Sequence, residues 1–289
     1  MMRGKIETLK RKLGEYRRHP ASFLMFAAVC LAAAAAMTAF GFVTVYILVK
    51  GIPNLNSELF AWKYNSENVS LMPALLNTVL ITVFALAIAV PVGIGAAVYL
   101  TEYAKRGNRF VGAVRITAET LSGIPSIVYG LFGALFFVKY LNFGLSLLSG
   151  AVTLAVMILP LIMRTAEEAL IAVPDSYREG SFGLGAGRLR TVFRVVLPDA
   201  VPGIMSGIIL SVGKIVGESA ALIFTAGTVA QAATSLFDSA RTLAVHMYVI
   251  SGEGLYIGQT YATAVVLLVF AALMNLLSSL LEKKIGRGK

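Results

Sequence analysis

The sequence has little charge and almost no cysteine. Of its 289 residues only 14% are charged and the mean hydropathy is +0.80, whereas soluble domains carry about 25% charged residues. This shortage excludes an ordinary water-soluble domain and indicates lipid as the solvent. Cys30 is the single cysteine, so an intramolecular disulfide and a multi-cysteine metal site are excluded. We expect Cys30 to be a small apolar residue in a helix.

Motifs for catalysis are missing as well. The sequence contains no G-x-x-x-x-G-K-S/T phosphate loop and no metalloprotease, nucleophile-elbow or paired-carboxylate signature. We therefore expect no enzyme activity, no metal site and no cofactor in this chain. His246 is expected to be an interfacial or hydrogen-bonding residue. The net charge of +10 does not indicate nucleic acid, because the basic residues lie in short segments between apolar runs.

Six apolar stretches are long enough to cross a bilayer, which takes about 20 residues each. We therefore predict an all-α integral membrane protein with six transmembrane helices. The first stretch follows a basic segment but is much longer than the apolar core of a signal peptide, so we interpret it as an anchor. The predicted spans cover residues 21–49, 74–100, 116–138, 145–163, 203–224 and 256–281.

The basic residues predict the orientation of these spans. Of the 25 lysines and arginines, seven precede the first span, four follow the second, five follow the fourth and four follow the sixth. Such residues concentrate on the cytoplasmic side. Both termini are therefore predicted to be cytoplasmic, as a basic segment at 1–20 and a basic tail at 282–289. The outer connection 226–255 is apolar enough to include a re-entrant or interfacial helix.

The cytoplasmic segment 164–198 carries the pattern of two short amphipathic helices. Ser176 and Glu179 have the spacing of a capping box, which predicts a helix that begins there. Glycines at 183, 185 and 187 break it, and a second helical pattern runs to Pro198, which is expected to stop it. Such a hairpin either docks into a groove on a partner protein or lies at the lipid headgroups. Glu167 and Glu168 are expected on its solvated face.

Lys214 and Glu218 are the only ionisable residues well inside a predicted span. Each costs about 2.5–3.5 kcal/mol at the bilayer centre, and their spacing of four places them on one helical face, where they can partly neutralise each other. They are either a buried ion pair that fixes helix packing or part of a pathway for an anion, with Ser219 beside them. We favour the pathway, in which Glu218 restrains the ammonium.

A second candidate for the pathway is the stretch that contains Pro125 and Ser126. Proline and glycine in a span free backbone groups, which are tolerated where they face a cavity or another helix. These amides and the Ser126 hydroxyl would receive phosphate oxygens. The alternative is a plain kink with Ser126 bonded to its own helix.

Two sets of motifs resemble those of known permeases. The first is Glu179-Gly180-Ser181-x-x-x-Gly185, followed after nine residues by Val195-Val196-Leu197-Pro198. It resembles the EAA loop of ABC-importer permeases, with Gly180 and Ser181 in place of two alanines. The resemblance implies that Glu179, Gly180, Ser181, Gly185, Leu197 and Pro198 belong to a coupling helix that docks on an ATP-hydrolysing subunit.

The second set is similar to phosphate-specific permeases, and its last motif is similar to the PstA type, not to the PstC type. It comprises Gly123-Ile-Pro-Ser-Ile-Val-Tyr-Gly130, Val216-Gly-Glu-Ser-Ala-Ala-Leu-Ile223 and Arg241-Thr-Leu-Ala-Val-His-Met-Tyr248. Together with the EAA-like loop these matches cover roughly residues 75–280. One departure is Lys214, where that family mostly has arginine; lysine lacks the bidentate fork of arginine, so a direct contact between Lys214 and phosphate does not carry over.

The resemblance implies a type I ABC-importer permease fold, with a permease domain at 74–281 that includes the coupling loop 164–198. It further implies import of inorganic phosphate through the cytoplasmic membrane by alternating access. The implied partners are a PstC-type permease, a PstB-type ATPase dimer that uses ATP and magnesium, a PstS-type phosphate-binding protein and membrane lipid, but no nucleic acid. Alternatives are a permease for molybdate, sulfate or phosphonate, a secondary transporter, whose usual inverted repeats are not evident, and a membrane-embedded enzyme.

Overall fold

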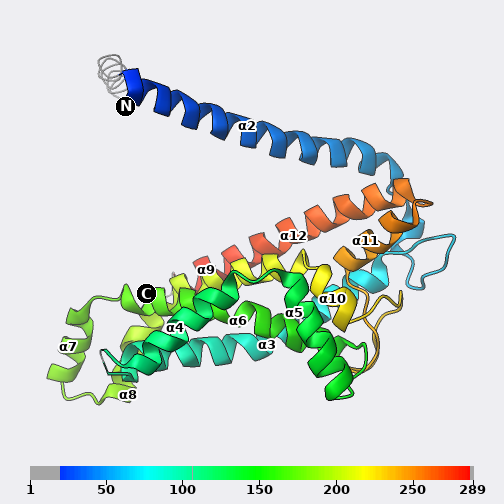
Figure 1. The fold of residues 1–289 in the computed structure, drawn as a ribbon. Helices are drawn as coiled ribbons and strands as arrows, with labels where there is room; N and C mark the ends of the chain where they lie inside the picture. The colour runs from blue at the N-terminus through cyan, green and yellow to red at the C-terminus, as the bar shows by residue number, and fades with distance from the viewer. Residues whose placement is uncertain (1–19, 106, 287–289) are drawn as a thin grey trace.

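The computed structural model describes residues 20–105 and 107–286, and this part of the chain contains helices and loops without a strand (Figure 1). The predicted basic N-terminal segment therefore lies outside the described residues except for Pro20. The predicted C-terminal tail is described only at its start, where residues 282–286 continue the last helix.

Five helices in the described part are long and apolar enough to cross a membrane. Their main parts are α2 (Pro20–Gly51), α3 (Met72–Val98), α6 (Leu147–Ile171), α9 (Leu197–Val216) and α12 (Ile257–Gly286). Since α6 continues to Ile171, the predicted fourth span is too short, and the connection after it begins later than residue 164.

The third predicted span, residues 116–138, is not one straight helix. It consists of α4 (Arg109–Ser122) and α5 (Ser126–Gly133), with a π-helical continuation η4 (Ala134–Tyr140), and the pair is bent by 102°. Pro125 lacks a backbone N–H and disfavours helical geometry at Ile124, which explains the break. The chain has six spans if this bent pair counts as one.

Shorter elements connect these helices. On one side of the bundle are the π-helical turn η3 (Tyr99–Tyr103) and the helices α7 (Asp175–Gly183) and α8 (Arg188–Thr191) with the π-helical turn η5 (Val192–Val196). On the other side are the 3₁₀ turns η1 (Ile52–Asn54) and η2 (Ser57–Phe60) and the helices α10 (Ala220–Thr225) and α11 (Leu243–Glu253). The outer connection thus contains a helix, α11, as its apolar character suggests.

The segment around Pro198 contradicts the sequence-based boundaries. Pro198 does not stop a helix, because α8, η5 and α9 form one run from Arg188 to Val216. In the π turn the N–H of Leu197 bonds to the carbonyl of Val192, and Pro198 follows in the first turn of α9, where a missing donor is tolerated. The predicted span 203–224 is likewise wrong at its end, since α9 finishes at Val216 and α10 is separate.

Helices α3, α6 and α9 pack together at the centre, with α12 against α9. Buried Ile81 of α3 and Leu154 and Ile158 of α6 belong to the main apolar core. Gly207 lets α9 approach α6 so closely that a Cβ atom there would overlap Thr165, as small residues do at helix contacts in membranes.

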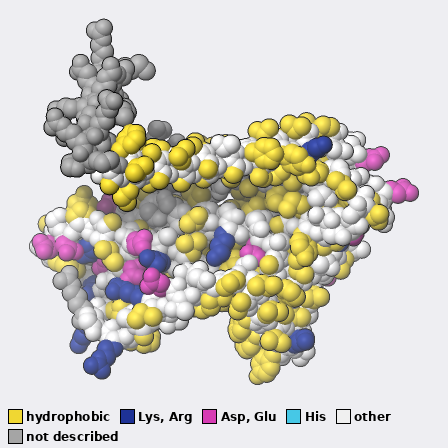
Figure 2. Space-filling view, turned by 45° about the horizontal axis from the view of Figure 1, so that its top comes forward, with side chains coloured by type: hydrophobic (Ala, Val, Ile, Leu, Met, Phe, Trp, Pro, Cys, Tyr) yellow, Lys and Arg dark blue, Asp and Glu magenta, His cyan; other side chains and the backbone are white. Residues whose placement is uncertain are grey.

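Helix α2 stands apart from this bundle. Figure 1 shows it diverging from the other helices and meeting α12 only near its own C-terminal end, and its span is not buried against the rest of the chain. In Figure 2 apolar side chains cover much of α2, whereas charged side chains gather at the end of the molecule that carries α7 and α8. Other charged side chains lie toward the middle and at the opposite end of this view.

Candidate functional site

The segment predicted to dock on a partner forms a helical hairpin. Helix α7 begins directly after Pro174, and no side chain caps it. The predicted capping box is therefore wrong, because Ser176 lies inside the helix and its hydroxyl makes no cap. Gly185 has a φ of +82°, a conformation that glycine adopts without strain, and it turns the chain toward α8. The glycine break is confirmed.

The tip of this hairpin exposes large apolar side chains. Leu184 is 91% exposed and Leu189 is 65% exposed, and Tyr177, Phe182 and Phe193 are also exposed. Figure 1 shows that α7 and α8 project beyond the ends of the bundle helices. An apolar patch that projects from a folded domain is typical of a surface that another protein covers.

The six predicted coupling residues divide into two groups. Glu179, Gly180 and Gly185 are exposed on the projecting part, while Ser181 is partly buried with its hydroxyl 2.8 Å from that of Thr191. The other two predicted residues, Leu197 and Pro198, are partly buried in the run from α8 to α9. The first group is placed for contact with a partner, and the second connects the hairpin to the bundle.

Arg178 fastens α7 to the bundle. Its Nη2 donates to Glu102 Oε1 at 2.7 Å and to the carbonyl of Leu170 at 2.9 Å. Its Nη1 donates to the carbonyl of Val173 at 2.7 Å and to Asp175 Oδ1 at 3.2 Å. One side chain thus joins α7 to the ends of α3 and α6, an arrangement that we call the Arg178 clamp.

The clamp is largely shielded from water. The side chain of Arg178 is 15% exposed and that of Glu102, in η3 at the end of α3, is 9% exposed. Charge-assisted, multidentate bonds of this kind are the strong ones. Glu102 and Arg178 are 76 residues apart, and sequence reasoning missed the pair; the one available signal was an acidic residue directly after the second span.

A second ion pair on this side also corrects a prediction. Glu167 is not solvated: it is buried and accepts from Arg115 Nε at 2.6 Å, which joins α6 to α4. Glu168 is exposed, as predicted, and pairs with Arg164 one turn earlier. The two neighbouring glutamates, about 100° apart around the helix axis, therefore differ in burial and in partner.

Lys214 and Glu218 do not form the predicted ion pair, since no nitrogen–oxygen contact within 4.0 Å joins them. The spacing of four pairs side chains only on a continuous helix, and α9 ends at Val216. Glu218 is buried and its Oε1 accepts from the Ala221 N–H at 3.0 Å, so it caps α10. Lys214 is exposed and lines a cavity of about 740 Å³ together with Ser206 and Asn275.

The residues of the other predicted pathway element lie at two neighbouring helix breaks. Pro125 precedes α5 and Ser126 begins it, while Ser219 precedes α10. Helix α5 packs on α10 so closely that a Cβ atom at Gly130 would overlap Ala221. The structure brings these two breaks together and places the Lys214 cavity on α6, α9 and α12.

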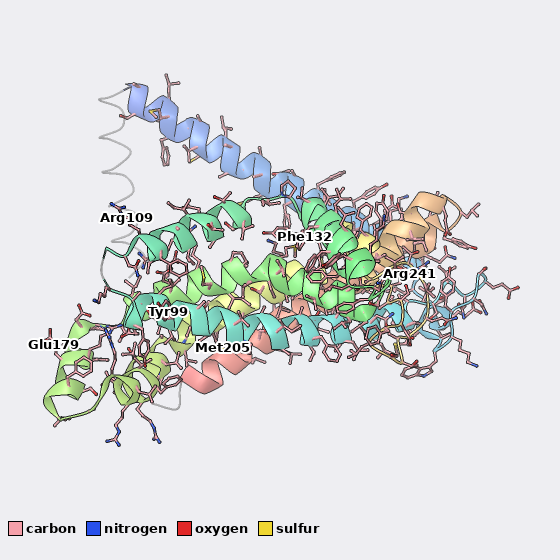
Figure 3. The ribbon with its side chains drawn as sticks, turned by 60° about the horizontal axis from the view of Figure 1, so that its bottom comes forward. Tyr99, Arg109, Phe132, Glu179, Met205 and Arg241 are labelled. Atoms are coloured by element: carbon pink, nitrogen blue, oxygen red, sulfur yellow. The ribbon has the colours of Figure 1, made fainter. Side chains whose placement is uncertain are left out.

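A buried polar cluster ties the opposite end together, where Figure 3 places Arg241 far from Glu179. Arg241 Nε donates to the carbonyl of Thr228 at 2.7 Å, and its Nη1 lies 3.3 Å from His246 Nδ1. The ring of Tyr64 lies beneath the guanidinium, 5.5 Å away, and against the His246 ring. Asn77 of α3 donates to the carbonyl of Arg241 at 3.1 Å. Four separate segments thus converge on this cluster.

His246 is fully buried in this cluster, and its Nε2 has no hydrogen-bond partner. Burial first, and the charge of Arg241 second, lower the pKa of His246 from 6.5 to about 4, against a smaller opposing effect of the Val69 backbone. His246 is therefore neutral at pH 7. A group that binds its proton more weakly when folded stabilises the fold less as the pH falls from about 6.5 toward 4.

We therefore expect acid to destabilise the protein through His246. Between pH 7 and pH 5 the unfolded state binds the proton and the folded state does not, which lowers the free energy of unfolding by roughly 2 kcal/mol. Thermal unfolding of the detergent-solubilised protein at both pH values measures this loss. His246→Gln should reduce the difference between the two pH values; an unchanged difference would contradict the assignment.

The comparisons with known proteins agree with this architecture. Residues 89–287 match the family described as "Binding-protein-dependent transport system inner membrane component". The chain is 34% identical over 225 residues to the probable ABC transporter permease protein YqgI of Bacillus subtilis, covering 73% of this chain and 76% of that protein. It is 40% identical over 154 residues to the phosphate transport system permease protein PstA 1 of Mycobacterium tuberculosis, covering 53% and 50%. The expected PstA-type resemblance is confirmed.

Solved ABC transporters share the fold. A chain of the bacterial alginate ABC transporter, in complex with its alginate-loaded periplasmic protein, matches with a TM-score of 0.67 at 14% identity, covering 94% of this chain and 98% of that one. A chain of the methionine transporter MetNI in an inward-facing conformation matches with a TM-score of 0.53 at 21% identity, covering 83% and 96%. The family match spans more than half of the sequence, and the chain belongs to the binding-protein-dependent inner membrane components, the permease subunits of ABC importers.

Proposed function

We propose that this chain is a permease subunit of an ATP-driven importer of inorganic phosphate, with both termini in the cytoplasm of the cell and the spans in the cytoplasmic membrane. It pairs with a homologous PstC-type permease, binds a PstB-type ATPase dimer through α7 and α8, and receives phosphate from a PstS-type binding protein. The distribution of lysine and arginine supports the orientation. The names of its PstA relatives support the substrate.

The observation that carries this proposal is the attachment of the hairpin to the bundle. Arg178 links α7 to the ends of α3 and α6, and α8 continues through η5 into α9. A displacement of the hairpin by the ATPase is therefore transmitted to three central helices at once. Alternating access then follows as a two-state equilibrium that ATP binding to the partner biases.

The pathway for the anion in this proposal runs past Lys214. Lys214 belongs to a helix that is long and apolar enough to span a membrane, and it lines a cavity with Asn275 and Ser206. Ionisable residues in spanning helices face a pathway or another subunit more often than lipid. Glu218 accepts a hydrogen bond from the first turn of α10 and does not hold Lys214. The permeases for molybdate, sulfate or phosphonate are the rival assignment, and uptake of each anion by the reconstituted transporter decides between them.

The hairpin surface can be tested with two substitutions at exposed positions. Glu179 and Gly185 are exposed, and a Cβ atom at Gly185 would contact nothing. The φ of +82° at Gly185 strains any other residue, by roughly 1–2 kcal/mol, so thermal unfolding of Gly185→Asp is measured beside its activity. We expect Glu179→Lys and Gly185→Asp each to lower ATP-driven uptake at least about tenfold, the effect of losing about 1.4 kcal/mol at the contact.

Copurification of the ATPase with the permease measures the docking step directly. Glu168→Lys serves as the matched control, because Glu168 is exposed on α6 outside the hairpin. If both hairpin variants copurify with the ATPase and transport normally, α7 is not part of the docking surface. A secondary transporter, the rival from another class, would purify without any ATPase.

A further inference from the structure

A cavity of about 940 Å³ lies behind the hairpin and has no role in the proposed function. Its walls come from η3, the start of α4, the end of α6, α7 and α8. In Figure 3 Arg109 of α4, Tyr99 of η3 and Glu179 of α7 lie at this same end of the molecule. The cavity thus borders both the hairpin and the ends of the spans.

The charges around the cavity are not balanced. Its two carboxylates, Glu102 and Asp175, both accept hydrogen bonds from Arg178, and Arg115 is paired with Glu167. Three further cations, Lys105, Arg109 and Arg188, line the cavity, and in the described part of the chain none of them has a carboxylate within 4.0 Å. Unpaired like charges around one space repel each other, and an anion in that space relieves the repulsion.

The other walls are partly apolar. Beside polar Thr101 and Asn108, the lining has four large apolar side chains, of which two are buried, Leu100 and Val111, and two are exposed, Ile171 and Phe182. Beside the cavity α4 presents Phe110 and Ile116, which are 62% and 67% exposed. An exposed apolar helix next to cations without carboxylate partners favours a ligand that is both anionic and apolar, such as a lipid. An acidic peptide of the ATPase would use the cations but not the apolar surface of α4.

We propose that the phosphate group of an anionic phospholipid binds in this cavity, against Lys105, Arg109 and Arg188, with its glycerol and acyl parts along α4. The inference rests on the cytoplasmic orientation of the proposed function, because the cytoplasmic leaflet is the anionic one. The bound headgroup lies beside the Arg178 clamp, so it holds the hairpin in place. Lipid composition thereby influences how tightly the ATPase is coupled.

The test measures lipid retention by the purified full-length chain in neutral detergent, by native mass spectrometry. Phosphatidylglycerol and phosphatidylcholine are titrated separately, and phosphatidylglycerol is then challenged with excess inorganic phosphate. We expect phosphatidylglycerol to be retained and the variant K105Q/R109Q to weaken its retention tenfold or more, at about 1 kcal/mol per basic residue. The matched control is K63Q/K139Q, which removes two exposed cations elsewhere.

The outcomes separate the possible ligands. Displacement by inorganic phosphate would show that the site also accepts the free ion, and resistance to it would show that the lipid is required; both support a phosphate site. Equal retention of phosphatidylcholine, or equal loss in both double variants, overturns the proposal. The proposal is also overturned if K105Q/R109Q retains phosphatidylglycerol but no longer copurifies with the ATPase, because the two cations would then bind the ATPase and not the lipid. Because this assay needs no transport, its failure leaves the proposed function intact.

Discussion

Arg178→Met is expected to lower ATP-driven uptake tenfold or more and to destabilise the protein. The substitution leaves Glu102 with a shielded carboxylate and no cation, and breaking one side of a buried pair costs about 3–5 kcal/mol. It also removes the bonds from α7 to the carbonyls of Leu170 and Val173. Thermal unfolding measures the loss of stability. The ratio of substrate transported to ATP hydrolysed measures the loss of coupling.

The double variant E102M/R178M separates stability from transmission. With the stranded carboxylate gone, an apolar pair of similar volume is often as stable as the buried ion pair, so we expect thermal stability to recover but uptake to stay low. R164M is the matched control, because Arg164 makes only exposed ion pairs, worth about 1 kcal/mol or less. Full uptake by E102M/R178M would contradict the prediction. It would show that the Arg178 clamp contributes to stability but does not transmit the movement of the hairpin.

Lys214→Gln is expected to reduce phosphate uptake about ten- to a hundredfold while assembly with the ATPase stays normal. A hydrogen bond from a charged donor contributes about 1.5–3 kcal/mol, which corresponds to this range. Lys214 is exposed on its cavity, and no carboxylate in the described part of the chain lies within 4.0 Å of it. Its replacement therefore leaves no buried carboxylate without a partner there, and folding should be unaffected. Uptake of labelled phosphate into reconstituted vesicles is the measurement.

Two further variants make this prediction specific. Lys214→Arg keeps the positive charge and should retain most of the uptake. Glu218→Gln should also retain it, because the amide oxygen still accepts from the Ala221 N–H that Glu218 now caps. Normal uptake by Lys214→Gln, or a loss in Glu218→Gln as large as that in Lys214→Gln, would contradict the assignment of the pathway to Lys214 alone.

Much of the fold follows from local sequence signals. Long apolar runs predict spans because the bilayer thickness sets a minimum length, and each predicted span is mainly helical in the structure, although 116–138 and 203–224 are interrupted. Gly185 predicts the turn of the hairpin because glycine adopts positive φ without strain. Pro125 predicts a break in the third span, but the 102° bend depends on how α5 packs against α10, which no local signal contains.

Two of the errors share one physical cause, which is contact between distant segments. Glu102 and Arg178 meet because the end of α3 lies beside α7, and Glu167 is buried where Arg115 of α4 reaches it. The Lys214–Glu218 pair failed because its prediction assumed a helix that continues past Gly217. A single sequence shows which residues share one face of a helix. It does not show which side chains from other helices lie beside them and form their hydrogen bonds and ion pairs.

The fold does not determine the cargo. Transporters of methionine and of alginate share it at 21% and 14% identity, and specificity in such folds resides in a few side chains along the pathway. The phosphate assignment therefore depends on Lys214 and its surroundings and on the PstA relatives, whereas the coupling to an ATPase depends on the hairpin. The two parts of the proposal can fail independently.

The side of the membrane on which the hairpin lies tests the central claim most directly. Leu184, the most exposed tip residue at 91%, is replaced by cysteine in a Cys30→Ala background, which removes the only native thiol. A membrane-impermeant maleimide should label this cysteine in inside-out vesicles and not in intact cells, and a bound ATPase should protect it. Labelling from outside the cell would show that α7 cannot meet a cytoplasmic ATPase and would contradict the account.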